Sequence, residues 1–358
     1  MCHNRNKMIL INNKLNLINE YKPSERMCTD GIKKLDWNEC NLTFDEKFKN
    51  LLYTSLFDIK YSEYPNINNT NLITKLSNYC GVNDDNVQIF NGSDSALHYI
   101  FAAFLNKETK ILIYYPNYNQ IETYIKLYSD NLNYSNIIDP FNQHIYNYDD
   151  IKNNDVIYIS NPNNPTGYCL DPENIENLLL NHPKKLFIID EAYYEFSKKS
   201  CSKLTNIYDN IIVTRTFSKA LSLASIRLGY ICANQKLINQ INKIRNTKEV
   251  NSFAQKLGEV VLDNFSFIDD RINEVITNRN LFEKILTQNG FTFIKSEANF
   301  VLVKVSDSEK IIKNLYDQKI LVRDRGMFSG FENTVRITIG NWDDMEIIIK
   351  KLLENEYK

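Results

Sequence analysis

"DVIYISNPNNPTG", residues 155–167, joins a strand pattern directly to a turn pattern. Its first six residues are mainly apolar, which predicts a buried strand over 155–160. The next seven contain two prolines, three asparagines and one glycine, and these residue types favour a turn of fixed shape. Asn164 lies between the two prolines, whose rings restrict the backbone. The stretch is therefore either a plain turn or a turn that aims an asparagine side chain at a bound molecule.

Further runs rich in Ile, Val and Tyr lie on both sides of this stretch. They are "KILIYYP" (110–116), "KLFIID" (185–190), "NIIVTRT" (210–216) and "LGYICA" (228–233). Helical patterns lie between the strands over 93–105 and 171–182, and the second opens with Asp171 as N-cap and Pro172 at the first helical position. This alternation predicts an α/β domain whose mostly parallel sheet is flanked by helices.

The pattern changes near residue 250. Long polar helical patterns cover 252–289, and short strand patterns and one helix follow up to 340. Helices segregated from a few strands predict a smaller α+β domain. We expect an N-terminal arm and part of the small domain over 1–37, a large domain over 38–250, and the small C-terminal domain over 251–358.

Composition excludes several classes of function. The 358 residues carry 42 basic and 44 acidic side chains and a net charge of −2, so no basic excess indicates binding to nucleic acid or to an anionic membrane. Seven scattered cysteines form no CxxC pair, and four histidines lack metal-ligand spacing, so we expect neither a disulfide framework nor a metal site. We find no signal peptide and no stretch of transmembrane length, so the cytoplasm is the expected location.

Polar residues gather where the predicted strands end, and ligands bind at that edge of a parallel sheet. "NGSDSALHYI" (91–100) places Ser93 and Asp94 at a helix N-terminus, which is either a capping pair or an anion site. "IIDEAYYEF" (188–196) ends a buried strand in Asp190, which requires a cation or a cap. "TRTFSKALSLASIRLGY" (214–230) holds Lys219, either an exposed residue or a buried amine made nucleophilic by a lowered pKa.

In this order, the segments resemble the fold type I pyridoxal-phosphate enzymes, the class I/II aminotransferases, with an aspartate aminotransferase-like fold. The resemblance runs from about Tyr21 to Gly340 and is greatest to histidinol-phosphate aminotransferases. It rests on short motifs, which read "EYKPS", "LDWNE", "SEYPN", "SNPNNPTG", "DEAYYEF", "FSKA" and "VRITIG".

The resemblance implies a role for each matching residue around pyridoxal 5′-phosphate. Lys219 would form a Schiff base with the cofactor and shuttle a proton, and Asp190 would pair with the pyridine nitrogen. Tyr193 and Asn164 would bind the ring oxygen, which would answer why the turn after 160 is so rigid. The expected phosphate and ring contacts of the same chain are Ser93, Asp94, Thr216, Ser218, Arg227 and, stacked on the ring, Tyr118.

The resemblance also implies partners. Tyr64 would reach the phosphate of a neighbouring subunit, which implies a homodimer. Arg336 would bind an anionic substrate group such as the α-carboxylate of L-glutamate. Arg323 and Tyr21 are the candidates for the distal phosphate of a keto acceptor. Imidazole acetol phosphate is the first candidate acceptor, and a smaller phosphorylated ketone or a nucleotide-sugar intermediate is an alternative.

The sequence departs from the family pattern at three places. Ser95 stands where a glutamate is usual, "NECN" (38–41) lacks the usual proline, and Ile121 replaces a second aromatic residue. These departures leave the acceptor open. A decarboxylase of phosphorylated hydroxy-amino acids, similar to threonine-phosphate decarboxylase, is the alternative enzyme. A regulator or degenerate binding module is the third hypothesis, which the presence of Lys219 disfavours.

Overall fold

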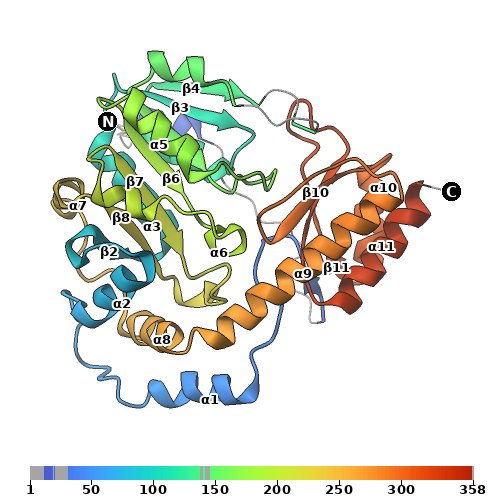
Figure 1. The fold of residues 1–358 in the computed structure, drawn as a ribbon, viewed down its shortest axis with the longest axis horizontal. Coiled ribbons are helices and arrows are strands. Elements are labelled where there is room, and N and C mark those ends of the chain that lie inside the picture. Colours follow the sequence, from blue (N-terminus) through green and yellow to red (C-terminus); the bar gives the residue numbers. More distant parts are fainter. Residues whose placement is uncertain (1–11, 19, 21–30, 138–139, 142–145, 357–358) are drawn as a thin grey trace, which may run out of the picture.

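The computed structural model describes residues 12–18, 20, 31–137, 140–141 and 146–356 (Figure 1). Its largest sheet has seven strands in the order β2-β8-β7-β6-β5-β3-β4. Their bounds are β2 (Val87–Phe90), β8 (Gly229–Ala233), β7 (Ile211–Thr216), β6 (Leu186–Asp190), β5 (Val156–Ser160), β3 (Lys110–Tyr115) and β4 (Asn131–Asn136). Only β8 runs antiparallel to its neighbours in this sheet, so the prediction of a mostly parallel sheet is confirmed.

Helices cover both faces of this sheet because successive side chains of each buried strand point to opposite faces. Phe187 and Ile189 of β6 join one apolar core, and Ile188 between them joins the other. The core that contains Ile188 is covered by α3 (Gly92–Phe104), α4 (Asn119–Tyr128) and α7 (Gln235–Asn242). The opposite core includes residues of α2 (Thr70–Cys80) and α5 (Pro172–Asn181).

The C-terminal part of the chain forms a smaller antiparallel sheet in the order β12-β13-β10-β9. These strands are β12 (Arg323–Asp324), β13 (Thr334–Thr338), β10 (Phe300–Lys304) and β9 (Phe293–Ile294). Figure 1 shows α10 (Ser308–Asp317) and α11 (Trp342–Glu356) beside this sheet. The long helix α9 (Ser266–Gln288) contacts α11 and β10 here and α6 (Tyr194–Ser197) of the larger part.

The N-terminal arm is joined to the C-terminal part. Strand β1 (Lys33–Lys34) pairs in parallel with β11 (Ile320–Leu321). This pairing supports the part of our proposed division in which residues before 38 belong with the small domain. The boundary near 250 stays a prediction, and α8 just after it contacts α1 and α2. The remaining elements are η1 (Asn13–Leu17), α1 (Glu46–Ser55), η3 (Asp84–Asn86), η4 (Tyr148–Asn153), η5 (Ser202–Asn206), η6 (Ala224–Ile226) and α8 (Ser252–Asp263).

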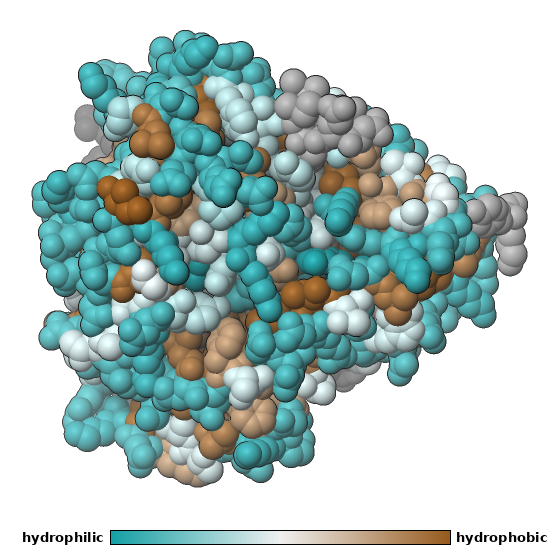
Figure 2. All heavy atoms as spheres, viewed as in Figure 1, coloured by the Kyte–Doolittle hydropathy of each residue, from teal (hydrophilic) through white to brown (hydrophobic). Residues whose placement is uncertain are grey.

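The face shown in Figure 2 is mainly hydrophilic, with hydrophobic residues in small separate patches. Tan and brown atoms also lie near its lower edge, where Figure 1 places α1. No helix within the described ranges has both the length and the apolar character needed to cross a bilayer.

Candidate active site

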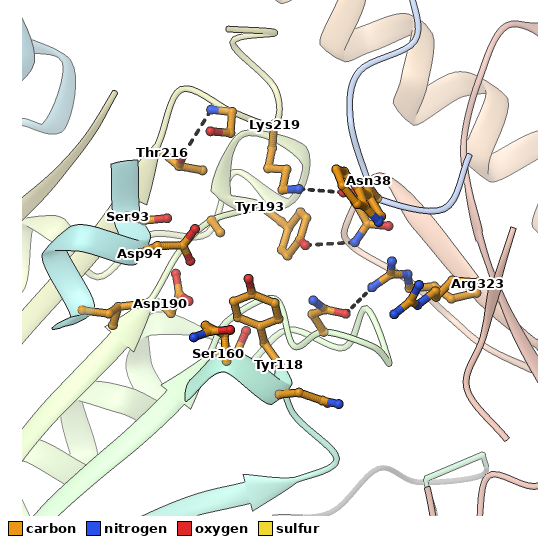
Figure 3. A pocket seen from close by; sticks show the side chains of 18 of the residues that line it. Asn38, Ser93, Asp94, Tyr118, Ser160, Asp190, Tyr193, Thr216, Lys219 and Arg323 are labelled. Carbon is orange, nitrogen blue, oxygen red and sulfur yellow. Dashed lines mark hydrogen bonds between the residues drawn. The ribbon is translucent and has the colours of Figure 1, made fainter. Parts of the chain in front are cut away.

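A large cavity of about 1450 Å³ lies where the strands of the main sheet end and the small antiparallel sheet begins. In Figure 3, Ser93, Asp94 and Asp190 lie on one side, Asn38 and Arg323 lie on the other, and Lys219, Tyr193 and Tyr118 lie between them. The cavity is lined by twelve of the residues predicted from sequence, which are Ser93, Asp94, Tyr118, Asn164, Asp190, Tyr193, Thr216, Ser218, Lys219, Arg227, Arg323 and Arg336.

The turn after β5 is held by its own asparagines. The Asn161 side chain donates to the Leu170 carbonyl at 3.0 Å and accepts from the Leu170 N–H at 2.6 Å. Asn163 accepts from the Thr166 hydroxyl at 2.7 Å. Asn164 alone among the three turns its amide into the cavity, where its Oδ1 accepts from Arg336 Nη1 at 2.6 Å. The rigid turn therefore does aim an asparagine at the cavity.

Asp190 ends β6 with its carboxylate buried, and two hydroxyl groups donate to it. Tyr158 Oη lies 2.7 Å from Asp190 Oδ2, and Thr214 Oγ1 lies 2.9 Å from Asp190 Oδ1. Burial raises the pKa of Asp190, and the two hydroxyl donors oppose that rise. Neither Tyr158 nor Thr214 is among the residues predicted from sequence, because each lies inside an apolar strand pattern.

Lys219 follows β7 and extends its amine into the cavity. Its Nζ donates to the carbonyl oxygen of Trp37 at 2.7 Å. Burial, and secondarily the charge of Arg336, lower the pKa of Lys219 to about 8. At neutral pH a measurable fraction of this amine is uncharged, which is the form that attacks a carbonyl carbon.

Tyr193 lies three residues after Asp190 and is held by Asn38, the residue that directly follows the N-terminal arm. Asn38 Nδ2 donates to Tyr193 Oη at 2.9 Å, and Thr338 Oγ1 donates to Asn38 Oδ1 at 3.1 Å. Asn38 is buried and has a φ of 57°, a backbone conformation that asparagine tolerates better than most residues. In the sequence, Asn38 belongs to the motif "LDWNE", and no sequence pattern predicts its contact with Tyr193.

One end of the cavity is suited to an anion. Arg227 Nη1 lies 3.2 Å from Ser218 Oγ, and Arg227 Nη2 lies 3.3 Å from Asp94 Oδ2 at the first turn of α3. A Cβ atom on Gly92 would lie 2.7 Å from Arg227 Nη2, and one on Gly229 would lie 2.3 Å from the backbone nitrogen of Ser93. Because Gly92 has no side chain, the Arg227 guanidinium can lie against it. Because Gly229 has none, β8 can pack against the N-terminus of α3, whose N–H groups suit an anion.

The other end is lined by arginines of the small sheet. Arg336 on β13 and Arg323 on β12 are direct cross-strand partners, so their side chains leave the same face. Arg325, two residues after Arg323, lines the cavity as well, although it was not predicted as a site residue. Burial lowers the pKa of Arg336 to about 10, and this arginine also donates to the Asp36 carbonyl.

Two predicted site residues are not placed at the cavity. Tyr64 is 78% exposed and lies 4.2 Å from Lys248 Nζ, measured to the ring centroid. Tyr21 lies outside the described residues. Of the three departures from the family pattern, Cys40 and Asn41 line the cavity. Ser95 instead donates to Glu249 at 2.6 Å, and Ile121 is fully buried in the apolar core, so neither residue lines the cavity.

Comparison with known proteins agrees with this architecture. The sequence profile of the family "Aminotransferase class I and II" matches residues 34–352. The chain is 35% identical over 338 residues to the dihydroxyacetone phosphate transaminase of Campylobacter jejuni, with 90% of each chain covered. It is 33% identical over 353 residues to the histidinol-phosphate aminotransferase of Brachyspira hyodysenteriae, with 96% of this chain and 97% of the relative covered.

The fold is likewise similar to a solved structure. The histidinol-phosphate aminotransferase of Sinorhizobium meliloti, solved in complex with pyridoxal 5′-phosphate, superposes with a TM-score of 0.85 at 20% identity and covers 96% of each chain. Aspartate aminotransferases share the fold as well, as predicted from sequence. The chain belongs to the class I and II aminotransferases, a family of pyridoxal-phosphate-dependent enzymes.

Proposed function

We propose that this aminotransferase moves an amino group between L-glutamate and a small phosphorylated keto compound, with pyridoxal 5′-phosphate as cofactor. The observation that carries the proposal is the pairing of Lys219 with Asp190 in one cavity. Lys219 offers a partly uncharged amine, and Asp190 offers a buried carboxylate to which no cationic side chain of the described residues is hydrogen-bonded. A ligand with a protonated ring nitrogen would supply the missing cation.

The residues present fit this cofactor. The end of the cavity that Ser93, Ser218 and Arg227 line suits its phosphate, and Asp190 suits its ring nitrogen. When bound, pyridoxal phosphate supplies an electron-withdrawing ring that weakens the bonds to the substrate's α-carbon. Lys219 would then hold and return the proton of that carbon at Nζ. Tyr193 and Asn164 would donate hydrogen bonds to the ring oxygen, and Tyr118 would cover the ring face.

The substrate end of the cavity supports the choice of anionic substrates. Arg336 would bind the α-carboxylate of glutamate, because its planar guanidinium can form two parallel hydrogen bonds. Arg323, its cross-strand partner, would bind the distal phosphate of the acceptor. Both relatives described above are named for phosphorylated substrates, which supports an acceptor of that class. Tyr21 stays a prediction for the same phosphate.

A homodimer belongs to the same proposal. Large aromatic side chains are exposed on α1, on the segment that follows it and at the start of α8, and these are Tyr53, Phe57, Tyr61, Tyr64 and Phe253. Phe57 is 79% exposed, and the rings of Tyr61 and Phe253 lie 5.7 Å apart. A clustered apolar surface of this kind is typical of a protein interface. Tyr64 would reach the partner's site from this surface. The cytoplasmic location stays a prediction.

The test is the visible absorption spectrum of the purified protein before and after addition of L-glutamate. We expect the yellow form of the bound cofactor to disappear and 2-oxoglutarate to restore it. Imidazole acetol phosphate and dihydroxyacetone phosphate are then compared as acceptors by the same reversal. A yellow protein that ignores glutamate and releases carbon dioxide from phosphorylated amino acids would contradict the proposal and support the decarboxylase alternative, which the relatives do not favour.

A further inference from the structure

Asp190 is held by hydroxyl groups from the strands on both sides of it. Asp190 pairs in register with Ser160 of β5 and with Thr214 of β7, so side chains at 158, 160, 190 and 214 leave the same face of the sheet. Thr214 reaches Asp190 Oδ1 from the directly paired position. Tyr158 lies two residues before Ser160 on β5, and the length of its side chain carries the hydroxyl to Asp190 Oδ2 at 2.7 Å.

The Tyr158 hydroxyl is placed in an otherwise apolar environment. Tyr158 is fully buried, and the core around it contains Ile188, Ile212 and the ring of Phe101 at 6.3 Å. A phenylalanine would fill this core without the need to satisfy a buried polar group. The hydroxyl therefore has one clear partner, the carboxylate, and the hydrogen bond to an ionised group is stronger than one between neutral groups.

The carboxylate still has capacity for a further donor. Two carboxylate oxygens accept about four hydrogen bonds in total, and each oxygen of Asp190 receives one from a neighbouring strand. The backbone of Ala192 supplies a third donor, which leaves capacity for one more from the cavity that Asp190 lines. The charged or titratable groups around that cavity wall are Asp94 from α3, Tyr118 from the start of α4, Tyr193 after β6, and Lys219 and Arg227 after β7.

We propose that Tyr158, assisted by Thr214, is a positioning residue that keeps Asp190 ionised and aims it at the ring nitrogen of the cofactor. Burial and the charge of Asp94 both favour the protonated acid, and the two hydroxyl donors oppose them. Without Tyr158, protonation of Asp190 would remove the anion that a pyridinium requires. The inference rests on the cofactor placement in the proposed function, and it does not depend on the identity of donor or acceptor.

The test measures how fast the holoenzyme, converted to the pyridoxamine form, releases pyridoxamine 5′-phosphate as a function of pH. Release should accelerate at low pH, where Asp190 becomes protonated. In Tyr158→Phe we expect the midpoint of this acceleration to rise by about one to two pH units, the shift that corresponds to one lost hydrogen bond to a charged group. Thr214→Val should shift it in the same direction, and the double variant should shift it further.

Two controls separate positioning from simple packing. Tyr114→Phe removes a buried hydroxyl from the adjacent strand β3, where it donates to the Asn147 carbonyl at 3.3 Å, and should leave the release midpoint unchanged. Asp190→Asn should abolish the acid-dependent acceleration. If Tyr158→Phe keeps the native midpoint, Tyr158 is a core residue and the inference is wrong. If Asp190→Asn keeps the native profile, the cofactor placement itself is wrong.

Discussion

Two adjacent carboxylates at the end of β6 show how differently the two faces of the sheet are used. Asp190 is 7% exposed and points toward the cavity, where its partners are neutral hydroxyl groups. Glu191 is 1% exposed and lies among different neighbours, where Arg215 Nη2 is 2.9 Å from its Oε2. The chain itself supplies the cation for Glu191. For Asp190, the hydrogen-bond donors among the described residues are all neutral.

The two buried carboxylates therefore differ in role: one stabilises the fold, and the other is suited to bind a ligand. Arg215 is fully buried, lies 3.7 Å from the ring centroid of Tyr194 and shares Glu191 with the hydroxyl of Ser200. Such a satisfied pair fixes the packing behind the site. Asp190 instead has a raised pKa and is suited to a ligand that brings a positive charge. We therefore expect substitutions behind the sheet to change folding, and substitutions in front of it to change cofactor binding.

The largest effect should follow from breaking the pair behind the sheet. Glu191→Leu leaves the buried charge of Arg215 without its partner, and the free energy of unfolding should fall by about 3–5 kcal/mol. Urea denaturation with and without cofactor measures this loss. The matched control is Glu191→Leu combined with Arg215→Met, which should recover much of the stability because both buried charges of the pair have been removed. A single variant as stable as the native protein would contradict the comparison.

A somewhat smaller effect should follow from the neutral isostere on the cavity face. Asp190→Asn keeps the shape but removes the charge that we propose faces the ring nitrogen, so cofactor affinity should fall by about 10- to 100-fold, the equivalent of a hydrogen bond to a charged group. Equilibrium dialysis of the cofactor measures the change. The unfolding free energy of the cofactor-free protein should not fall, because a desolvated carboxylate has been removed. A loss of stability like that of Glu191→Leu would show that the two faces do not differ as described.

The smallest effect is a pH dependence, which should distinguish Arg215 behind the sheet from Lys219 in the cavity. Arg215 stays charged at all accessible pH values, whereas the pKa of Lys219 is lowered to about 8. A lysine with a lowered pKa is mostly protonated below pH 8 and mostly neutral above it. The rate at which cofactor-free protein takes up pyridoxal phosphate should therefore rise about tenfold per pH unit below 8 and level off above it. Stopped-flow absorbance measures the rate. A rate that keeps rising toward pH 10 would show an ordinary lysine.

Much of this arrangement could be predicted from sequence, because it depends on local patterns. The five apolar runs became β3, β5, β6, β7 and β8. Polar residues at or shortly after the ends of the four parallel strands among them line the cavity, and these include Tyr118, Asn164, Asp190 and Ser218. Strand β4 was missed because "NLNYSN" is a polar strand at the sheet edge. The reversed direction of β8 could not be predicted either, since an apolar run has the same composition in both directions.

The missed site residues depend on long-range register. Tyr158 meets Asp190 only because β5 and β6 pair as they do, and in sequence it is one more apolar residue of a strand. Asn38 meets Tyr193 across 155 positions of sequence. Tyr64 was predicted for a neighbouring subunit, and its exposed ring in the single chain leaves that prediction open.

The contact between the two ends of the chain has a consequence for how the protein is made. Asn38 is hydrogen-bonded to Thr338, which lies 300 positions later in the chain. The preceding residue, Trp37, accepts a hydrogen bond from Lys219 at its carbonyl oxygen. During synthesis the N-terminal arm must wait until nearly all of the chain has left the ribosome. The large sheet can form before that point, but Lys219 and Tyr193 acquire their final neighbours last. We therefore expect a nascent chain to contain a folded large sheet before its cavity is complete.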